Sequence, residues 1–103
     1  MDYTVIELIL KEYLNSLSER LKNKIIIDKD YTWETSEYFI IGYNSESFLN
    51  NGNISDALVG NYPIVIDKST KHTYQLINYE DDFEKYTIDE LIDKNIIEKF
   101  PYD

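Results

Sequence analysis

The chain lacks cysteine altogether and has only three glycines, two prolines, one histidine and one tryptophan among its 103 residues. Without cysteine it cannot form disulfides, and with one histidine it cannot build the usual Cys and His ligand sets of structural zinc. No apolar run approaches the roughly 18 residues that a membrane-spanning helix needs. The glycines are too scattered for a phosphate-binding loop. These shortages exclude disulfide-rich, zinc-finger, helical membrane and P-loop proteins.

Basic residues are also scarce, with ten Lys and Arg against 20 Asp and Glu, which gives a net charge of -10. Such a chain would be repelled by polyanions, so we predict neither a nucleic-acid partner nor a membrane partner. A basic protein would instead be attracted, and salt would weaken that attraction. Because the N-terminus lacks the positive charge of a secretory signal, and because cysteine is absent, we expect the protein in the cytoplasm.

Apolar residues make up 43% of the chain and aromatic residues 15%, including ten tyrosines. This apolar content is enough for one packed core in a chain of this length, but not for two. We therefore expect a single domain over residues 1–103. The composition leaves the oligomeric state open.

The clearest helical pattern covers residues 4–23 and ends at Asn23, a residue that tolerates the left-handed conformation of a helix end. Apolar side chains recur there at three- and four-residue spacing, which is typical of a helix with one buried face. The recurring residues are Ile6, Leu10, Leu14, Leu17 and Leu21.

The start of this helix shows two local signals. Thr4 and Glu7 have the spacing of a capping box, in which each side chain accepts a hydrogen bond from a backbone N–H of the first turn. Tyr3 and Leu8 have the spacing of a hydrophobic staple. The same T-x-x-E pattern recurs at 87–90, near the other end of the chain.

Strand patterns follow at 24–30, 37–44, 62–67 and 72–77, where β-branched and aromatic residues cluster between charged or turn-forming residues. The segment 45–60 contains several potential helix caps and single apolar residues, which predicts one or two short helical turns.

The C-terminal region predicts a helix over 80–86, a second over 88–94, and a terminal segment ending at Phe100 and Pro101. Together these elements predict an α+β fold. In it, the N-terminal helix packs on an antiparallel sheet of about four strands. Short helices lie between the second and third strands, and the C-terminal tail is helical.

Asp67, Ser69 and His72 supply the residue types of a catalytic triad, but all three lie on one predicted hairpin turn. A histidine base would be solvent-exposed there, and no nearby glycine pair offers an oxyanion hole. The acidic run at 80–84 is contiguous and lacks the glycine of a calcium-binding loop. We therefore predict no enzyme activity, no metal and no cofactor.

Aromatic and acidic residues instead suggest a surface for binding another protein, because Tyr and Trp are enriched at the centres of interfaces. The tryptophan lies in the predicted turn DKDYTWETS, where its ring either covers the core or meets a partner. The candidate contact residues are Trp33, Tyr79, Glu80, Asp81, Asp82 and Glu84.

The stretch SFLNNGNISDALVGNYPIVIDKSTKHTYQL resembles the immunity protein 35 family of bacterial polymorphic-toxin systems. The matching positions are Phe48, Leu49, Gly52, Leu58, Gly60, Asn61, Pro63, Ile64, Val65, Ile66, Asp67, Lys68 and Leu76. The resemblance covers roughly 1–86. Lys71 stands where the family commonly has a turn glycine, so a different turn type is expected here. The tail past residue 87 is longer than the family's usual ending.

The resemblance implies a small cytoplasmic protein that binds and blocks a cognate toxin. The acidic, aromatic-rich surface suits a basic toxin such as a nuclease. Two other classes stay open. A general holdase-like chaperone would bind unfolded proteins through exposed apolar surface. An acidic nucleic-acid mimic would compete with DNA for a basic cleft.

Overall fold

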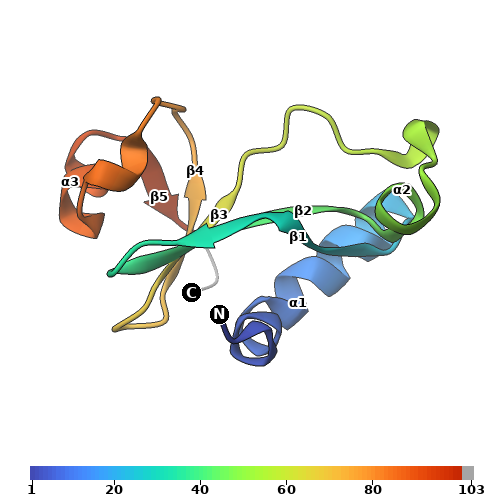
Figure 1. Cartoon of the computed structure of the whole chain (residues 1–103), viewed down its shortest axis with the longest axis horizontal. Helices are drawn as coiled ribbons and strands as arrows, with labels where there is room; N and C mark the ends of the chain where they lie inside the picture. The colour runs from blue at the N-terminus through green and yellow to red at the C-terminus, as the bar shows by residue number, and fades with distance from the viewer. Residues whose placement is uncertain (101–103) are drawn as a thin grey trace.

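Helix α1 (Tyr3–Leu21) lies across one face of a five-stranded antiparallel sheet (Figure 1). The computed structural model describes residues 1–100, and Pro101 lies outside them. The sheet order follows the chain. Its strands are β1 (Ile25–Glu34), β2 (Tyr38–Ser45), β3 (Ile64–Asp67), β4 (Thr73–Leu76) and β5 (Ile97–Lys99). The predicted α+β fold is confirmed, with five strands rather than about four.

The additional strand is β5, which lies in the part of the chain predicted to be a helical tail. It spans three residues, too few to show an alternating pattern in the sequence. The strand forms because Ile96 and Ile97 are buried, with 2% exposure each, and because its backbone pairs with β4 through Leu76 and Ile97. Tertiary pairing, rather than local propensity, decides its conformation.

The ends of α1 differ from the predicted ones. Asp2 is the N-terminal cap, and its Oδ1 accepts a hydrogen bond from the backbone N–H of Thr4 at 3.0 Å. The helix therefore begins before Thr4, the capping box that we predicted there is absent, and Leu8 is 69% exposed instead of forming a staple. At the other end Lys22, not Asn23, adopts the left-handed conformation, with φ 54°.

The face of the sheet under α1 forms the first part of the core. Ile6 and Leu10 of the helix are essentially inaccessible, with 0% and 1% exposure, and they pack against β-branched residues of the sheet. Phe100 joins this cluster and stacks on Tyr13 of α1, with ring centroids 4.7 Å apart. The C-terminal end of the described chain is thus packed against the N-terminal helix.

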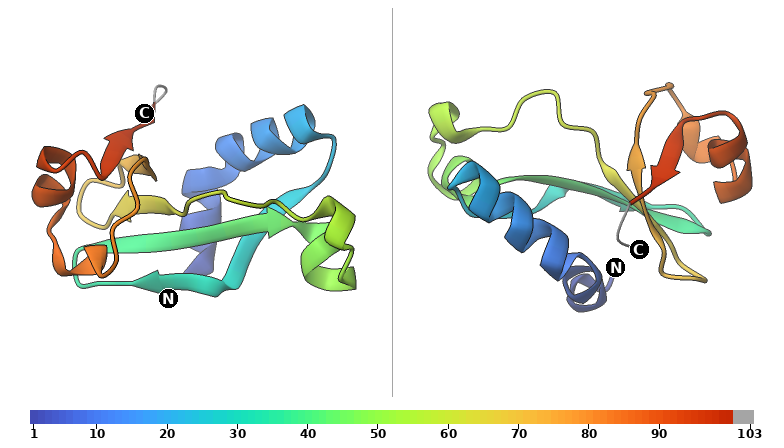
Figure 2. Two further views of the ribbon diagram at one scale, coloured as in Figure 1. Left: turned by 90° about the horizontal axis from the view of Figure 1, so that it is seen from above. Right: turned by 180° about the vertical axis from the view of Figure 1, so that it is seen from behind.

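Strand β2 is buried on both faces, as its sequence predicts. Ile41 belongs to the cluster under α1, whereas Tyr38 and Ile40 belong to a second cluster on the opposite face. The second cluster is covered by the 3₁₀ turn η2 (Phe83–Lys85) and by α3 (Ile88–Asp93). Figures 1 and 2 show α3 on the other side of the sheet from α1.

The short helices fall close to their predicted places. Between β2 and β3 lie α2 (Glu46–Asn51) and the 3₁₀ turn η1 (Ile54–Asp56). The capping box of Thr87 and Glu90 is present at the start of α3. The predicted helix over 80–86 was wrong, because only the single turn η2 forms there.

The buried Tyr38 joins the sheet to the C-terminal segment, because its hydroxyl donates to the carbonyls of Tyr86 at 2.9 Å and Phe83 at 3.3 Å. Tyr38→Phe leaves both acceptors without this donor, and we expect it to lower the free energy of unfolding by about 1.5 kcal/mol. Urea denaturation measures the loss. Tyr62→Phe, at a side chain that is 47% exposed, should change stability by less than about 0.5 kcal/mol. Equal values for the two variants would contradict the role of the Tyr38 hydroxyl.

The same environment affects the ionisation of this phenol. Burial, assisted by the nearby charges of Glu84 and Glu37, raises the pKa of Tyr38 to about 12. Folding therefore favours the neutral phenol, and this contribution to stability is complete below pH 10 and is lost as the pH rises toward 12.

Candidate functional site

Strand β1 contains a large bulge that shapes the open part of the second face. Asp28 pairs with Gly42 and Trp33 with Ile40, so residues 29–32 lie opposite the single residue Ile41 of β2. A bulge of this kind bends a strand and changes the direction of its side chains. It explains why this segment resembles a turn in the sequence although it belongs to a strand of ten residues.

Hydrogen bonds from one threonine fix the bulge. The Thr32 hydroxyl donates to the Asp28 carbonyl at 2.8 Å and accepts the backbone N–H of Gly42 at 3.1 Å. Asp28 Oδ1 also accepts the backbone N–H of Asp30 at 3.2 Å. The bulge then passes directly over Gly42. A Cβ atom at Gly42 would lie 2.5 Å from the backbone oxygen of Tyr31, so only glycine fits.

Trp33 was predicted to lie in a turn, and this was wrong: it lies in β1. Because it pairs with Ile40, its side chain shares the face of the sheet that carries the second core cluster. Trp33 is 38% exposed and is not one of the residues that form the second core cluster. It thus both packs on the sheet and presents surface to solvent.

Two loops complete the site from the other side. Tyr79, in the loop after β4, stacks on Tyr62 of the loop before β3, with centroids 6.3 Å apart and planes at 18°. Tyr79 also meets the buried Phe83 edge-on at 6.3 Å. The amide of Asn61 donates to the Tyr43 carbonyl at 2.9 Å, which ties the same loop to β2.

The result is a hollow of about 320 Å³, which we call the aromatic groove. Its lining includes Tyr31, Trp33, Phe48, Pro63 and Tyr79. Figures 1 and 2 show the segment between η1 and β3 arching over the same side of the sheet, opposite α1. Two of our candidate residues, Trp33 and Tyr79, are therefore brought together from distant parts of the sequence.

The four acidic candidates follow Tyr79 in the sequence, and all four are exposed, whereas Phe83 between them is buried. We call Glu80, Asp81, Asp82 and Glu84 the acidic loop. Glu80 accepts a hydrogen bond from the Tyr86 hydroxyl at 2.9 Å. Asp82 has a left-handed backbone, with φ 59°. The charge of Asp81, with further contributions from Glu84 and Asp82, raises the pKa of the Tyr79 phenol. The acidic loop thus places negative charge beside the groove.

Sequence reasoning missed Tyr31 and Asp28, which also line the groove. A strand assignment for DYTWE would have found Tyr31, since alternate residues of a strand share a face. Asp28 reaches the groove because it pairs with Gly42, and that register depends on the bulge rather than on any local pattern.

The β3–β4 hairpin carries the residues that resembled a triad. The Ser69 hydroxyl donates to Asp67 Oδ1 at 3.0 Å, and the Ser69 backbone N–H donates to the same oxygen at 2.9 Å. Partial burial raises the pKa of Asp67, but hydrogen bonds from Ser69 and Thr70 outweigh it and lower the pKa below its ordinary value. His72 is exposed. Lys71 does occupy the left-handed position of the turn, with φ 65°.

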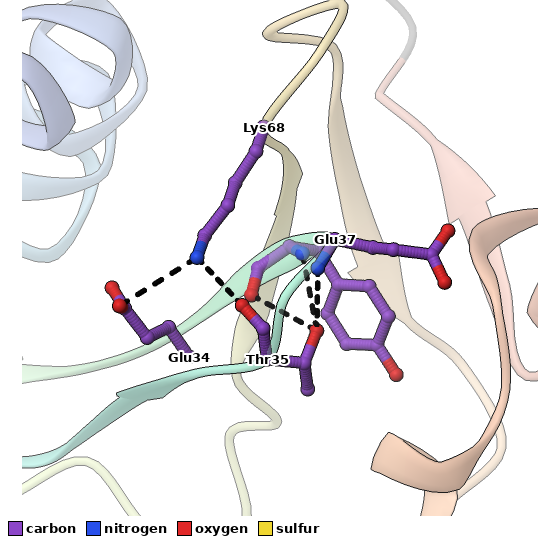
Figure 3. Close-up of polar contacts among 5 residues, drawn as sticks. Glu34, Thr35, Glu37 and Lys68 are labelled. Carbon is purple, nitrogen blue, oxygen red and sulfur yellow. Dashed lines mark hydrogen bonds and ion pairs between the residues drawn. The ribbon is translucent and has the colours of Figure 1, made fainter.

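Lys68 joins the two hairpins of the sheet (Figure 3). Its Nζ donates to the Thr35 carbonyl at 2.6 Å and lies 3.6 Å from the Glu34 carboxylate. Its backbone N–H donates to the backbone carbonyl of Glu37 at 2.9 Å. The Glu37 carboxylate points away from this contact. A second hollow, of about 390 Å³, borders Asp67 and Lys68. Both side chains already have partners within the chain.

Within residues 1–100, no three His, Asp or Glu side chains gather in a way that could hold a metal ion. No helix in this part of the chain is long and apolar enough to cross a membrane.

A groove lined by partly exposed aromatic side chains is typical of a surface that binds another protein. The chain matches the family model of Immunity protein 35 over residues 9–89 and belongs to that family. Membership implies toxin neutralisation as the function and a cognate toxin as the partner. No curated protein and no solved structure matches the chain.

Proposed function

We propose that the protein neutralises its toxin in the cytoplasm by stoichiometric binding, without catalysis, and that the aromatic groove and the acidic loop form the contact surface. The observation that carries this proposal is the meeting of Trp33 and Tyr79 in one groove, with the acidic loop beside it. Aromatic side chains in a hollow supply most of the binding energy in many interfaces.

Electrostatic attraction supports a basic toxin, such as a nuclease. The net charge of -10 creates a field that attracts a basic protein over a distance set by ionic strength. The acidic loop concentrates part of this charge next to the groove. Such charges mainly increase the association rate, whereas the apolar contacts of the groove slow dissociation.

Reversing two charges of the acidic loop tests this mechanism. We choose Asp81→Lys with Glu84→Lys, because Asp82 has a left-handed backbone that lysine would strain. The association rate with the toxin should fall about tenfold at roughly 0.02 M salt, and by less at roughly 0.15 M, where the Debye length is about 8 Å. Stopped-flow or surface-plasmon measurements at both salt concentrations give these rates.

The matched control is Glu12→Lys with Glu19→Lys on the exposed side of α1. It changes the net charge by the same amount on a different element, so it reports the effect of net charge alone. A much smaller decrease is expected for this pair. Equal decreases for both pairs would show that the acidic loop does not lie at the contact surface.

A further inference from the structure

The aromatic groove contains one carboxylate among its rings. Asp28 pairs with Gly42, so its side chain lies on the groove face, and both residues belong to the groove lining. Asp28 is partly buried, so a cation beside it would attract it more strongly than it would attract a carboxylate surrounded by water. Within residues 1–100, neither of the two side-chain ion pairs involves Asp28.

The rings around this carboxylate also favour a cation. Tyr31, Trp33 and Tyr79 border the groove, and the face of an aromatic ring attracts a positive charge placed over it. The acidic loop adds negative potential, as the raised pKa of the Tyr79 phenol reflects. The lining therefore combines apolar contact surface with an attraction for positive charge.

We propose that the groove binds the side chain of an arginine presented by a protein partner. A guanidinium is planar, so it stacks on aromatic rings while its N–H groups donate to a carboxylate. A lysine ammonium is more strongly hydrated and cannot stack in this way. At about 320 Å³ the groove lies at the small end of ligand pockets, about 300–1,000 Å³, which suits one side chain.

An apolar side chain fits this lining less well. It would cover Asp28 without supplying a counter-charge, so the carboxylate would lose hydration that the Asp30 N–H alone does not replace. The assignment of this arginine to the toxin rests on the proposed function. The preference of the groove for a guanidinium is independent of that function and can be measured without the toxin.

Trp33 is the only tryptophan in the chain, so its fluorescence reports directly on the groove. We would titrate the protein with N-acetyl-arginine amide and, separately, with the corresponding lysine, leucine and citrulline amides. Citrulline has nearly the shape of arginine but no charge. We expect a saturable change with arginine, in the millimolar range, and at least about fivefold weaker binding of citrulline. An equal response to citrulline, lysine or leucine, or no saturation, would overturn the proposal.

Variants separate the groove from the rest of the acidic surface. Asp28→Asn keeps the oxygen that accepts the Asp30 N–H but removes the charge, and Tyr79→Leu removes one ring. Each should weaken arginine binding about fivefold or more. Asp30 lies in the bulge but outside the groove lining, so Asp30→Asn should leave arginine binding unchanged. A loss in Asp30→Asn equal to that in Asp28→Asn would contradict a specific site.

The toxin then serves as a separate measurement. If Asp28→Asn weakens both arginine binding and toxin binding, the groove accepts an arginine of the toxin. If it weakens only arginine binding, the guanidinium site stands and the proposed toxin-binding surface is wrong.

Discussion

Gly42→Ala should lower the free energy of unfolding by about 3 kcal/mol and change the fluorescence of Trp33. The added Cβ would lie 2.5 Å from the backbone oxygen of Tyr31 and 2.8 Å from its Cβ atom. Because a backbone oxygen cannot move aside alone, the whole bulge would have to shift. Overpacking of this kind costs about 1–3 kcal/mol, occasionally more. Urea denaturation followed by far-ultraviolet circular dichroism measures the stability.

The control for this variant is Gly52→Ala. Gly52 has a left-handed backbone, with φ 73°, and an added Cβ atom there meets nothing within 4 Å. This substitution tests backbone strain without a clash, and it should cost about 1 kcal/mol. If Gly42→Ala costs no more than Gly52→Ala, the bulge does not pack against Gly42 as described. A groove that depends on the bulge should also bind arginine less well in Gly42→Ala.

Leu10→Ala should lower the free energy of unfolding by about 3 kcal/mol, whereas Leu8→Ala should change it by less than about 0.5 kcal/mol. The two leucines are two positions apart on α1, but Leu10 is 1% exposed and Leu8 is 69% exposed. The first substitution leaves a cavity between α1 and the sheet, and the second removes atoms that already contact solvent. Chemical denaturation of both variants under the same conditions gives the comparison.

This pair also tests the start of α1. If Leu8 and Tyr3 formed a hydrophobic staple, Leu8→Ala would be clearly destabilising, by about 1 kcal/mol or more. A measured loss of that size would contradict the cap at Asp2. Similar losses for Leu8→Ala and Leu10→Ala would further contradict the orientation of the helix on the sheet.

The parts of the fold that the sequence predicted depend on patterns within one element. The alternation of Tyr38, Ile40 and Gly42 with Phe39 and Ile41 correctly assigned the two faces of β2, because side chains alternate in every strand. The Thr87 capping box was likewise predictable, since its members are only three residues apart.

The parts that were missed depend on pairing between elements. Asp2 and Thr4 are both good caps, and the choice between them depends on where the helix packs, so the sequence could not decide it. The strand β5 exists because β4 offers it a partner. The bulge is a difference in register between β1 and β2, which neither strand shows alone.

The candidate site likewise has a part that the sequence predicts and a part that depends on contacts between elements. Trp33 and Tyr79 could be selected from residue type and context, but their meeting in one groove depends on the bulge and on the stack of Tyr79 with Tyr62. Asp28, the residue that gives the groove its proposed preference for arginine, had no signal in the sequence. The binding roles of all these residues stay predictions.

The order of the strands in the sheet, β1 to β5, repeats their order in the chain. Each strand therefore pairs only with the strands next to it in the sequence, and no pairing has to wait for a distant segment. A sheet whose strands pair in chain order has a lower contact order than one with distant pairings, and lower contact order favours faster folding. A protein that acts as proposed, by binding its toxin, must fold before it meets that toxin. We therefore expect this topology to shorten the interval between synthesis of the chain and protection of the cell.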